Sequence, residues 1–232
     1  MVRNAEIYTW FGLPIYESEV DSKPVFQDRM LKFCEKYYEE NKHLRGGNGA
    51  ITGDTHGTFS NICKTSSDFY YLSHAVGLHA TTYLGQLGVD TKKVRLNIVK
   101  SWPVCCENGS YIKPHRHIGS HLSAVYYVQK ETDSDTGQLR FHRGDDFMRN
   151  LPIHGDSMFS ETRLSNNYVD YNLGSNTIVI FPSTVEHEVT RYEGTSMRYS
   201  ISLDILVTAK TEISNVEHVC TDPSTWVTIP FA

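Results

Sequence analysis

Residues 94–208 contain a succession of about eight short β-prone segments, and this feature restricts the possible folds more than any other. Turn-forming residues separate the segments, which lie at 94–106, 115–118, 122–129, 137–142, 168–171, 177–181, 187–192 and 197–208. Short strands at such spacing are typical of all-β sandwiches and barrels. We therefore predict that this half of the chain is a mostly β barrel.

The N-terminal part has helical periodicity instead. The run from Asp21 to Pro24 has the features of a helix start, a capping residue followed by proline in the first turn. The expected buried face of this helix consists of Phe26, Met30, Phe33, Cys34 and Tyr37. A second helix is expected over 67–87, with a buried stripe of Leu72, Val76, His79, Tyr83 and Leu87. We expect both helices to buttress the barrel, with a possible edge strand at 6–11 and a Gly-rich loop at 46–64.

Composition sets the broad class of the protein. Hydrophobic residues make up 39% of the 232 residues and charged residues 21%, as in a soluble globular protein. We expect one domain, 1–232, made of an N-terminal strand and supporting helices (1–93), a β-helix core (94–208) and a tail (209–232) that adds an edge strand. The net charge of -5 and the lack of a basic run make nucleic acid an unlikely partner.

Cysteine usage and hydropathy bear on the compartment. The five cysteines are an odd number, and no Cys-x-x-Cys pair occurs. These features favour reduced thiols and a cytoplasmic location. No apolar run approaches the length of a membrane span, so no membrane association is expected.

Two histidines, His115 and His117, stand one residue apart just before the apolar run 122–129. Alternate side chains of an extended segment project to one face, so both imidazoles can point at one metal ion. His187, seventy residues further on, is the best candidate for a third ligand. This order of ligands is that of a double-stranded β-helix metal site. Imidazole suits several transition metals, so the ligands do not select one. The alternative is a pair of ordinary surface histidines, since the chain has 11.

Four motifs follow one another in order: His115-Arg-His117; Ser123-Ala-Val-Tyr-Tyr-Val128 with Thr136-Gly-Gln-Leu-Arg-Phe141; Asn176-Thr-Ile-Val-Ile-Phe-Pro-Ser183 with His187-Glu-Val189; and Arg198-Tyr-Ser-Ile-Ser202. The series, over about 95–205, resembles the Fe(II)/2-oxoglutarate-dependent dioxygenases, especially their prolyl-hydroxylase-like branch and small bacterial and phage oxygenases. It departs from the latter at Ile118, where they have proline, and at Ala124, where they have glycine. The resemblance implies a double-stranded β-helix (jelly-roll or cupin-like) and a hydroxylase, an oxidoreductase that uses Fe(II), 2-oxoglutarate and O2.

The resemblance also implies roles for single residues. His115 and His187 match iron ligands, and Arg198 matches the basic residue that binds the distal carboxylate of 2-oxoglutarate. A guanidinium suits this role because its rigid fork matches a carboxylate. The same comparison places three further residues around the cosubstrate: Ser200 and Tyr127 as hydroxyl contacts to its carboxylate, and Leu139 as an apolar wall. Taken alone, Arg198 is better explained as a surface ion-pair partner and Tyr127 as a core aromatic, whereas the ordered set favours the site.

His117 stands where the superfamily usually has Asp or Glu, and three explanations compete. In the first, the site is a working three-His iron centre. In the second, a carboxylate comes from elsewhere in the chain, with Glu186 and Asp204 the nearest candidates by sequence. In the third, the iron chemistry is lost. The corresponding alternatives in function are a cupin-like three-His metal enzyme that does not use 2-oxoglutarate, including a zinc enzyme, and a non-catalytic ligand-binding barrel.

The substrate is not encoded in any motif. Loops 46–64 and 143–166 are candidates to cover it because of their length and composition. His121 and His154 are possible substrate contacts, although solvated loop histidines are the simpler interpretation.

Overall fold

The computed structural model describes residues 12–46, 48–53, 61–65, 69–131, 135–144, 167–210 and 223–225. Helices occupy mainly the first part of this chain and long strands the second. In order, the elements are β1 (Tyr16–Glu19), α1 (Pro24–Asn41), η1 (Lys42–Leu44), β2 (Ile51–Thr52), α2 (Ile62–Thr65), α3 (Tyr70–Gln86), β3 (Val94–Cys106), β4 (Ile112–His115), β5 (Leu122–Gln129), β6 (Leu139–His142), β7 (Tyr168–Tyr171), β8 (Thr177–Pro182), β9 (His187–Val189), β10 (Arg198–Ala209) and η5 (Pro223–Thr225).

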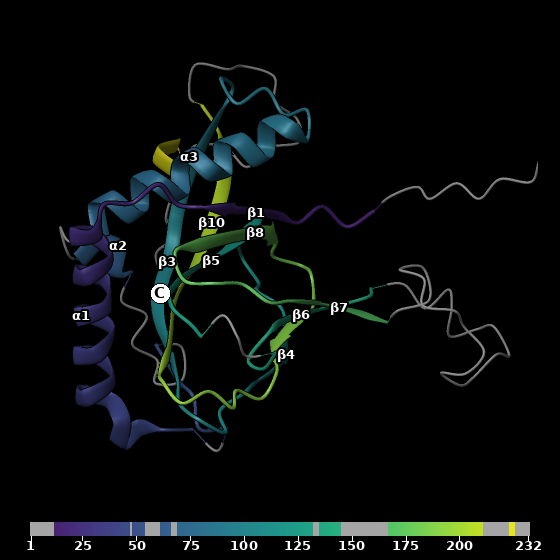
Figure 1. Ribbon diagram of the computed structural model, residues 1–232. Coiled ribbons are helices and arrows are strands. Elements are labelled where there is room, and N and C mark those ends of the chain that lie inside the picture. Colours follow the sequence, from purple (N-terminus) through teal and green to yellow (C-terminus); the bar gives the residue numbers. More distant parts are fainter. Residues whose placement is uncertain are drawn as a thin grey trace, which may run out of the picture.

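The strands form two antiparallel sheets. The larger sheet has the order β1-β8-β5-β10-β3-β2, and the smaller has the order β4-β9-β6-β7. Consecutive strands of the chain thus alternate between sheets, as β4 to β6 and β8 to β10 do, which is the pattern of a double-stranded β-helix. Figure 1 shows the smaller sheet on one side of the larger sheet and the helices on the other. The predicted fold class, a mostly β barrel buttressed by N-terminal helices, is confirmed.

Helix α1 begins at Pro24, as the sequence predicts, because proline needs no hydrogen-bond partner at the first helical position. The predicted side-chain cap is wrong. Lys23 occupies the N-cap position without a side-chain cap, and the Ser22 hydroxyl donates instead to Asn176 Oδ1 at 2.8 Å. Asn176 has a positive φ of 66°, which asparagine tolerates better than most residues, just before β8. Its contact with Ser22 ties the start of the first helix to the sheet.

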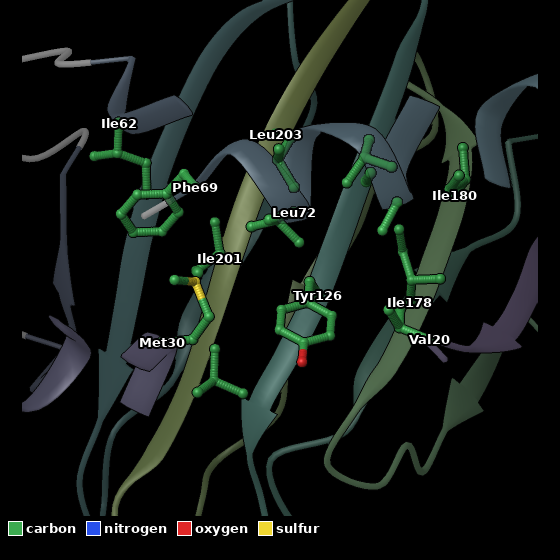
Figure 2. Close-up of a cluster of buried hydrophobic side chains, with 14 of the residues drawn as sticks. Val20, Met30, Ile62, Phe69, Leu72, Tyr126, Ile178, Ile180, Ile201 and Leu203 are labelled. Atoms are coloured by element: carbon green, nitrogen blue, oxygen red, sulfur yellow. The ribbon is translucent and has the colours of Figure 1, made fainter. Parts of the chain in front are cut away.

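The main hydrophobic core lies between the helices and the outer face of the larger sheet. Figure 2 shows part of it, in which Met30, Phe69 and Leu72 of the helical side meet Ile201 and Leu203 of β10. The predicted helical faces are largely confirmed. Leu87 is an exception, with 48% of its surface exposed, because α3 ends at Gln86. His79, expected to be a packed or capped histidine, has its Nδ1 2.8 Å from the Tyr16 hydroxyl.

A second core fills the space between the two sheets. Its buried members come from β5, β6, β8 and the segment before β8: Val125, Tyr127, Leu139, Phe141, Leu173, Val179 and Phe181. A third cluster, on the inner face of β3, contains Trp102, Val104 and Cys106. Side chains from both sheets therefore surround the interior of the barrel, where the predicted site residues lie.

Several boundaries differ from the predictions. The Gly-rich loop at 46–64 contains the short elements β2 and α2, and β3 continues through Pro103. The Pro103 carbonyl accepts a hydrogen bond from Gly53 N. Its missing N–H therefore faces the β2 edge rather than β10, where proline is tolerated.

Other predictions fall partly or wholly on residues outside the described ranges. These are the strand at 6–11, most of loop 143–166 with His154, and the edge strand in the tail, of which the described part is η5. Cys34, Cys63, Cys105 and Cys106 are all free. Within the described ranges, no helix combines the length and apolarity needed to cross a membrane.

Candidate metal centre

Strands β4 and β9 bring two of the three predicted ligands together. His115 and His187 are direct Cα partners in this antiparallel pair, and their ring centroids are 4.3 Å apart. Side chains of opposed residues on neighbouring strands share a face. His187 is buried and faces the barrel interior beside Phe181, with ring centroids 4.8 Å apart. The pairing of the two strands thus converts a separation of 72 residues into contact.

His117 reaches the same point by a different route from the one predicted. Strand β4 ends at His115, so the alternation of side chains along a strand does not extend to His117. Its backbone N–H donates to the Ser183 carbonyl at 3.0 Å, which holds the segment after β4 against the end of β8. Its ring centroid lies 5.2 Å from that of His115 and 5.1 Å from that of His187. One nitrogen from each of the three rings lies within 4.8 Å of the others.

Hydrogen bonds to Nδ1 determine the tautomer of these rings. His115 Nδ1 lies 2.8 Å from the Lys113 carbonyl, and His187 Nδ1 lies 2.9 Å from the Val185 carbonyl. A carbonyl can only accept, so both Nδ1 atoms carry the proton and Nε2 is the unprotonated nitrogen of each neutral ring. His117 Nδ1 likewise faces an acceptor, Asp204 Oδ1, at 2.5 Å. Three rings with the same tautomer converge on one point, which fits a metal ion.

Burial keeps the His187 imidazole neutral. It lowers the pKa of His187 to about 3, with smaller contributions from the nearby imidazoles of His115, His117 and His142. Metal ligation requires neutral imidazole, because a protonated ring has no lone pair to donate. His187 is therefore ready to bind a metal over the whole physiological pH range.

Neither of the two predicted alternative carboxylates joins the three histidines. The Glu186 side chain is 40% exposed and lies 3.6 Å from Arg116 on the surface. Asp204 is buried, but it lies behind His117 and contacts the nitrogen that faces away from the metal position. Within the described residues, the group of side chains that could hold a metal consists of the three histidines. The candidate donor set is thus three imidazoles, a ligand type that suits iron as well as zinc, nickel or copper.

Strand β10 places a row of polar side chains on the inner face of the larger sheet. Arg198, Ser200, Ser202 and Asp204 are all buried, and their even spacing puts them on one face. Asp204 marks the end of the row near the histidines, and Arg198 marks the other end. The row therefore leads from the histidine cluster into the barrel.

Arg198 is the most unusual member of this row. Only 1% of its surface is exposed, yet its nearest polar partners are neutral: the Tyr127 hydroxyl, 3.3 Å from Nη2, and Cys106 Sγ, 3.9 Å from Nη1. Its Nε atom is buried without a hydrogen-bond partner. A buried cation is costly unless an anion pairs with it. The side chain therefore fits an anionic ligand with two oxygen acceptors, such as a carboxylate.

The other predicted cosubstrate contacts surround Arg198. Tyr127 and Ser200 are Cα partners in the β5–β10 pair, and the Tyr127 ring centroid lies 5.0 Å from Arg198 Cζ. Leu139 is buried in the same cluster as Tyr127. The structure thus brings Tyr127, Ser200 and Arg198 together, with Leu139 on the opposite sheet.

Sequence reasoning missed Lys130, a second buried cation at this end of the strands. The register of β10 against β5 shifts between Tyr199 and Ser200, so that Gln129 pairs with Tyr199 and Lys130 follows beside Arg198. Its Nζ donates to Asn172 Oδ1 at 2.6 Å. Burial, and secondly the charge of Arg198, lower the pKa of Lys130 to about 8. A lysine directly after an apolar strand was the available signal, but the register shift that turns it inward was not visible in the sequence.

The predicted substrate contacts are less well defined. His121 is exposed, and its Nδ1 accepts a hydrogen bond from Val207 N at 3.0 Å, which gives it a structural role at the edge of β10. A better candidate for a neighbour of the metal is Trp102, whose ring centroid lies 5.5 Å from that of His117. Trp102 was not predicted, because tryptophan in a strand is more often an ordinary core residue.

Comparisons with known proteins agree with this geometry. Residues 100–204 match the sequence model of a family described as "Putative 2OG-Fe(II) oxygenase". This range contains the three histidines and Arg198 of the candidate site. No curated protein matches the chain significantly.

Solved structures share the fold at low sequence identity. A prolyl hydroxylase from Trichoplax adhaerens, solved with a hypoxia inducible factor peptide, is 16% identical, with a TM-score of 0.54 and coverage of 82% of both chains. The non-heme alpha ketoglutarate dependent epimerase SnoN is 12% identical, with a TM-score of 0.58 and coverage of 93% of this chain and 87% of that one.

A shorter match is to a 2OG-Fe(II) oxygenase family oxidoreductase from Burkholderia pseudomallei, which is 13% identical with a TM-score of 0.43. It covers 60% of this chain and 57% of that one. Residues 100–204, somewhat less than half of the chain, are thus similar in sequence to the putative 2OG-Fe(II) oxygenase family, and the chain shares its fold with solved structures that include a prolyl hydroxylase and an alpha ketoglutarate dependent epimerase.

Proposed function

We propose that the protein is a hydroxylase that binds Fe(II) through His115, His117 and His187. Bound iron would supply activation of O2, with substrate C–H, O2 and 2-oxoglutarate converted into substrate C–OH, succinate and CO2. The three ring nitrogens that lie within 4.8 Å of one another support this ligand set. A metal held by three protein ligands would keep coordination positions for the cosubstrates.

The proposal extends to the 2-oxoglutarate site. Arg198 binds the distal carboxylate, the hydroxyls of Tyr127 and Ser200 add hydrogen bonds, and Leu139 forms an apolar wall. The observation that carries this assignment is the burial of the Arg198 guanidinium with an unpartnered Nε and only neutral partners. A dry, cationic site of this kind favours a carboxylate over water, because the charge pair is screened little there.

The residues of this chain then have simple roles in the reaction. The histidines hold the metal, the Arg198 end of β10 orients the cosubstrate, and the apolar cluster around Phe141 and Phe181 excludes water. The substrate is an organic molecule or a peptide that approaches from the exposed side of the histidines, near Arg116 and Ile118.

The test is an anaerobic titration of metal-free protein with Fe(II) and then with 2-oxoglutarate, in which the visible charge-transfer band of the chelate is followed. We expect a band with one-to-one stoichiometry. In Arg198→Met the concentration of 2-oxoglutarate needed should rise about 100-fold, the cost of a buried charge-assisted contact.

Arg191→Met is the matched control, because Arg191 is exposed and donates to the Gly109 carbonyl. It should leave the titration unchanged. Iron binding without any band would refute the 2-oxoglutarate site and favour a three-His enzyme of the cupin kind. Absence of metal binding would favour a ligand-binding barrel.

A further inference from the structure

The three histidines differ in what lies behind them. The Nδ1 atoms of His115 and His187 face backbone carbonyls, whereas that of His117 faces the Asp204 carboxylate at 2.5 Å. Asp204 is only 2% exposed and lies in the middle of β10. The outer face of this strand is apolar there, and the inner face carries the serines Ser200 and Ser202. A buried carboxylate is costly, so a carboxylate kept at this position requires a reason beyond packing.

A chain of hydroxyl groups leads to this carboxylate. Ser120 Oγ donates to Ser183 Oγ at 2.9 Å, Ser183 and Ser123 are joined at 2.9 Å, and Ser123 Oγ donates to Asp204 Oδ1 at 3.3 Å. If each hydroxyl donates toward the next, all three dipoles point their positive ends at Asp204. The network therefore stabilises negative charge on the carboxylate, in addition to the half-exposed Lys100, whose Nζ lies 4.0 Å from Asp204 Oδ2.

We propose that Asp204 is a positioning residue that supplies, through His117, the negative charge that an acidic ligand at position 117 would have supplied directly. A carboxylate that accepts the Nδ1 proton fixes the ring orientation and makes Nε2 a stronger donor to the metal. An ionised Asp204 gives the set of three histidines the same formal charge as two histidines plus a bound carboxylate. The charge is moved one hydrogen bond away from the metal.

This inference rests on the metal site of the proposed function but not on 2-oxoglutarate. Asp204→Asn is the decisive variant, because the amide oxygen can still accept from His117 while the charge is lost. We expect the affinity for Co(II), measured by its ligand-field absorption, to fall about 10–100-fold. We also expect the Fe(III)/Fe(II) midpoint potential to rise, since less negative charge near the metal disfavours Fe(III).

Two further variants separate charge from structure. Ser123→Ala removes a hydroxyl that lies 3.3 Å from Asp204 Oδ1 and 3.2 Å from His117 Nδ1 without changing charge, and should alter Co(II) affinity less than about threefold. Lys100 Nζ lies 4.0 Å from Asp204 Oδ2 with a side chain 40% exposed. Lys100→Gln should therefore act in the opposite direction from Asp204→Asn, with a lower midpoint potential and an affinity raised by a few-fold at most.

The three variants together test whether Asp204 acts through its charge, even if one of them fails to fold. A folded Asp204→Asn protein with wild-type affinity and potential would overturn the proposal. So would an equal loss in Ser123→Ala, which would assign the effect to the network rather than to charge, or a higher potential in Lys100→Gln. The measurements of Co(II) affinity and midpoint potential do not use 2-oxoglutarate. A failed 2-oxoglutarate titration would therefore leave the proposed role of Asp204 intact, and a refuted role of Asp204 would leave the proposed cosubstrate site intact.

Discussion

The two faces of strand β10 are equally buried and chemically opposite. Toward the helices it presents Tyr199, Ile201, Leu203 and Ile205, and toward the smaller sheet it presents Arg198, Ser200, Ser202 and Asp204. A central strand that is covered on both faces usually has an almost continuous apolar sequence. The difference teaches that burial alone does not identify a core. The outer face stabilises the fold, whereas the inner face gives up hydrophobic burial in order to hold charged and polar groups without water.

The largest effect should come from removing a metal ligand. His187→Ala should lower metal affinity by more than the about 100-fold that loss of an outer hydrogen-bond partner can cost, because a direct ligand is lost. The folded state should survive, since the histidine belongs to the site and not to the main core. Isothermal titration with Ni(II) measures the affinity. His43→Ala, at an exposed position, is the control and should bind Ni(II) as wild type does. Equal Ni(II) affinities of wild type, His187→Ala and His43→Ala would show that the metal binds elsewhere.

The outer face of β10 should give the reverse result. Leu203 is completely buried in the main core, so Leu203→Ala should lower the free energy of unfolding by about 2–5 kcal/mol. Metal affinity of the folded protein should stay within about twofold, since Leu203 points away from the site. Urea unfolding of the metal-free protein measures the first quantity. Leu78→Ala, at a position 61% exposed, should change stability by less than about 0.5 kcal/mol. A loss of metal affinity in Leu203→Ala would mean that the two faces are coupled.

A smaller and pH-dependent effect is expected at Lys130. Its pKa of about 8 lies below the ordinary lysine pKa of 10.5, so between these values the unfolded chain binds more protons and wild-type stability rises with pH. Below pH 8 the cost of burying the charge is fully present. Lys130→Met should therefore be more stable than wild type at pH 7, by up to about 3 kcal/mol, and the advantage should shrink as pH approaches 10.5.

The comparison of the two proteins at each pH cancels titrations elsewhere in the chain. Lys32→Met serves as control, because Lys32 is exposed and pairs with Asp28 on its own helix. An advantage of Lys130→Met that does not vary with pH would assign it to packing. In that case Lys130 would not carry a buried charge on the inner face.

Much of the fold was predictable because its signals are local. The strand limits of 94–106 and 122–129 agree with β3 and β5, since runs of β-branched and aromatic residues bounded by turn residues define them. The start of α1 at Pro24 followed from the fixed φ of proline. The cap, the exposure of Leu87 and the two short elements between 46 and 65 were not predicted correctly, because contacts with distant segments decide them.

For the site, the sequence by itself determined the candidates: three histidines, a basic residue eleven positions after the last of them, and an acid in the middle of a late strand. Their ordered spacing was enough to indicate the family. Their tautomers, partners and distances could not follow from order along the chain, because strands from two different sheets supply them.

Only the tertiary structure decided which role each acid and each cation has. Pairing of β4 with β9 joins His115 to His187, and the end of β8 holds His117 in place after its strand has ended. The Asp204 carboxylate points at His117 Nδ1, so Asp204 is a hydrogen-bond acceptor rather than a candidate metal ligand. A register shift in the β5–β10 pair brings Lys130 to Arg198. In each case the reason is that a side chain's partner depends on strand register and sheet packing, and these are properties of the whole chain.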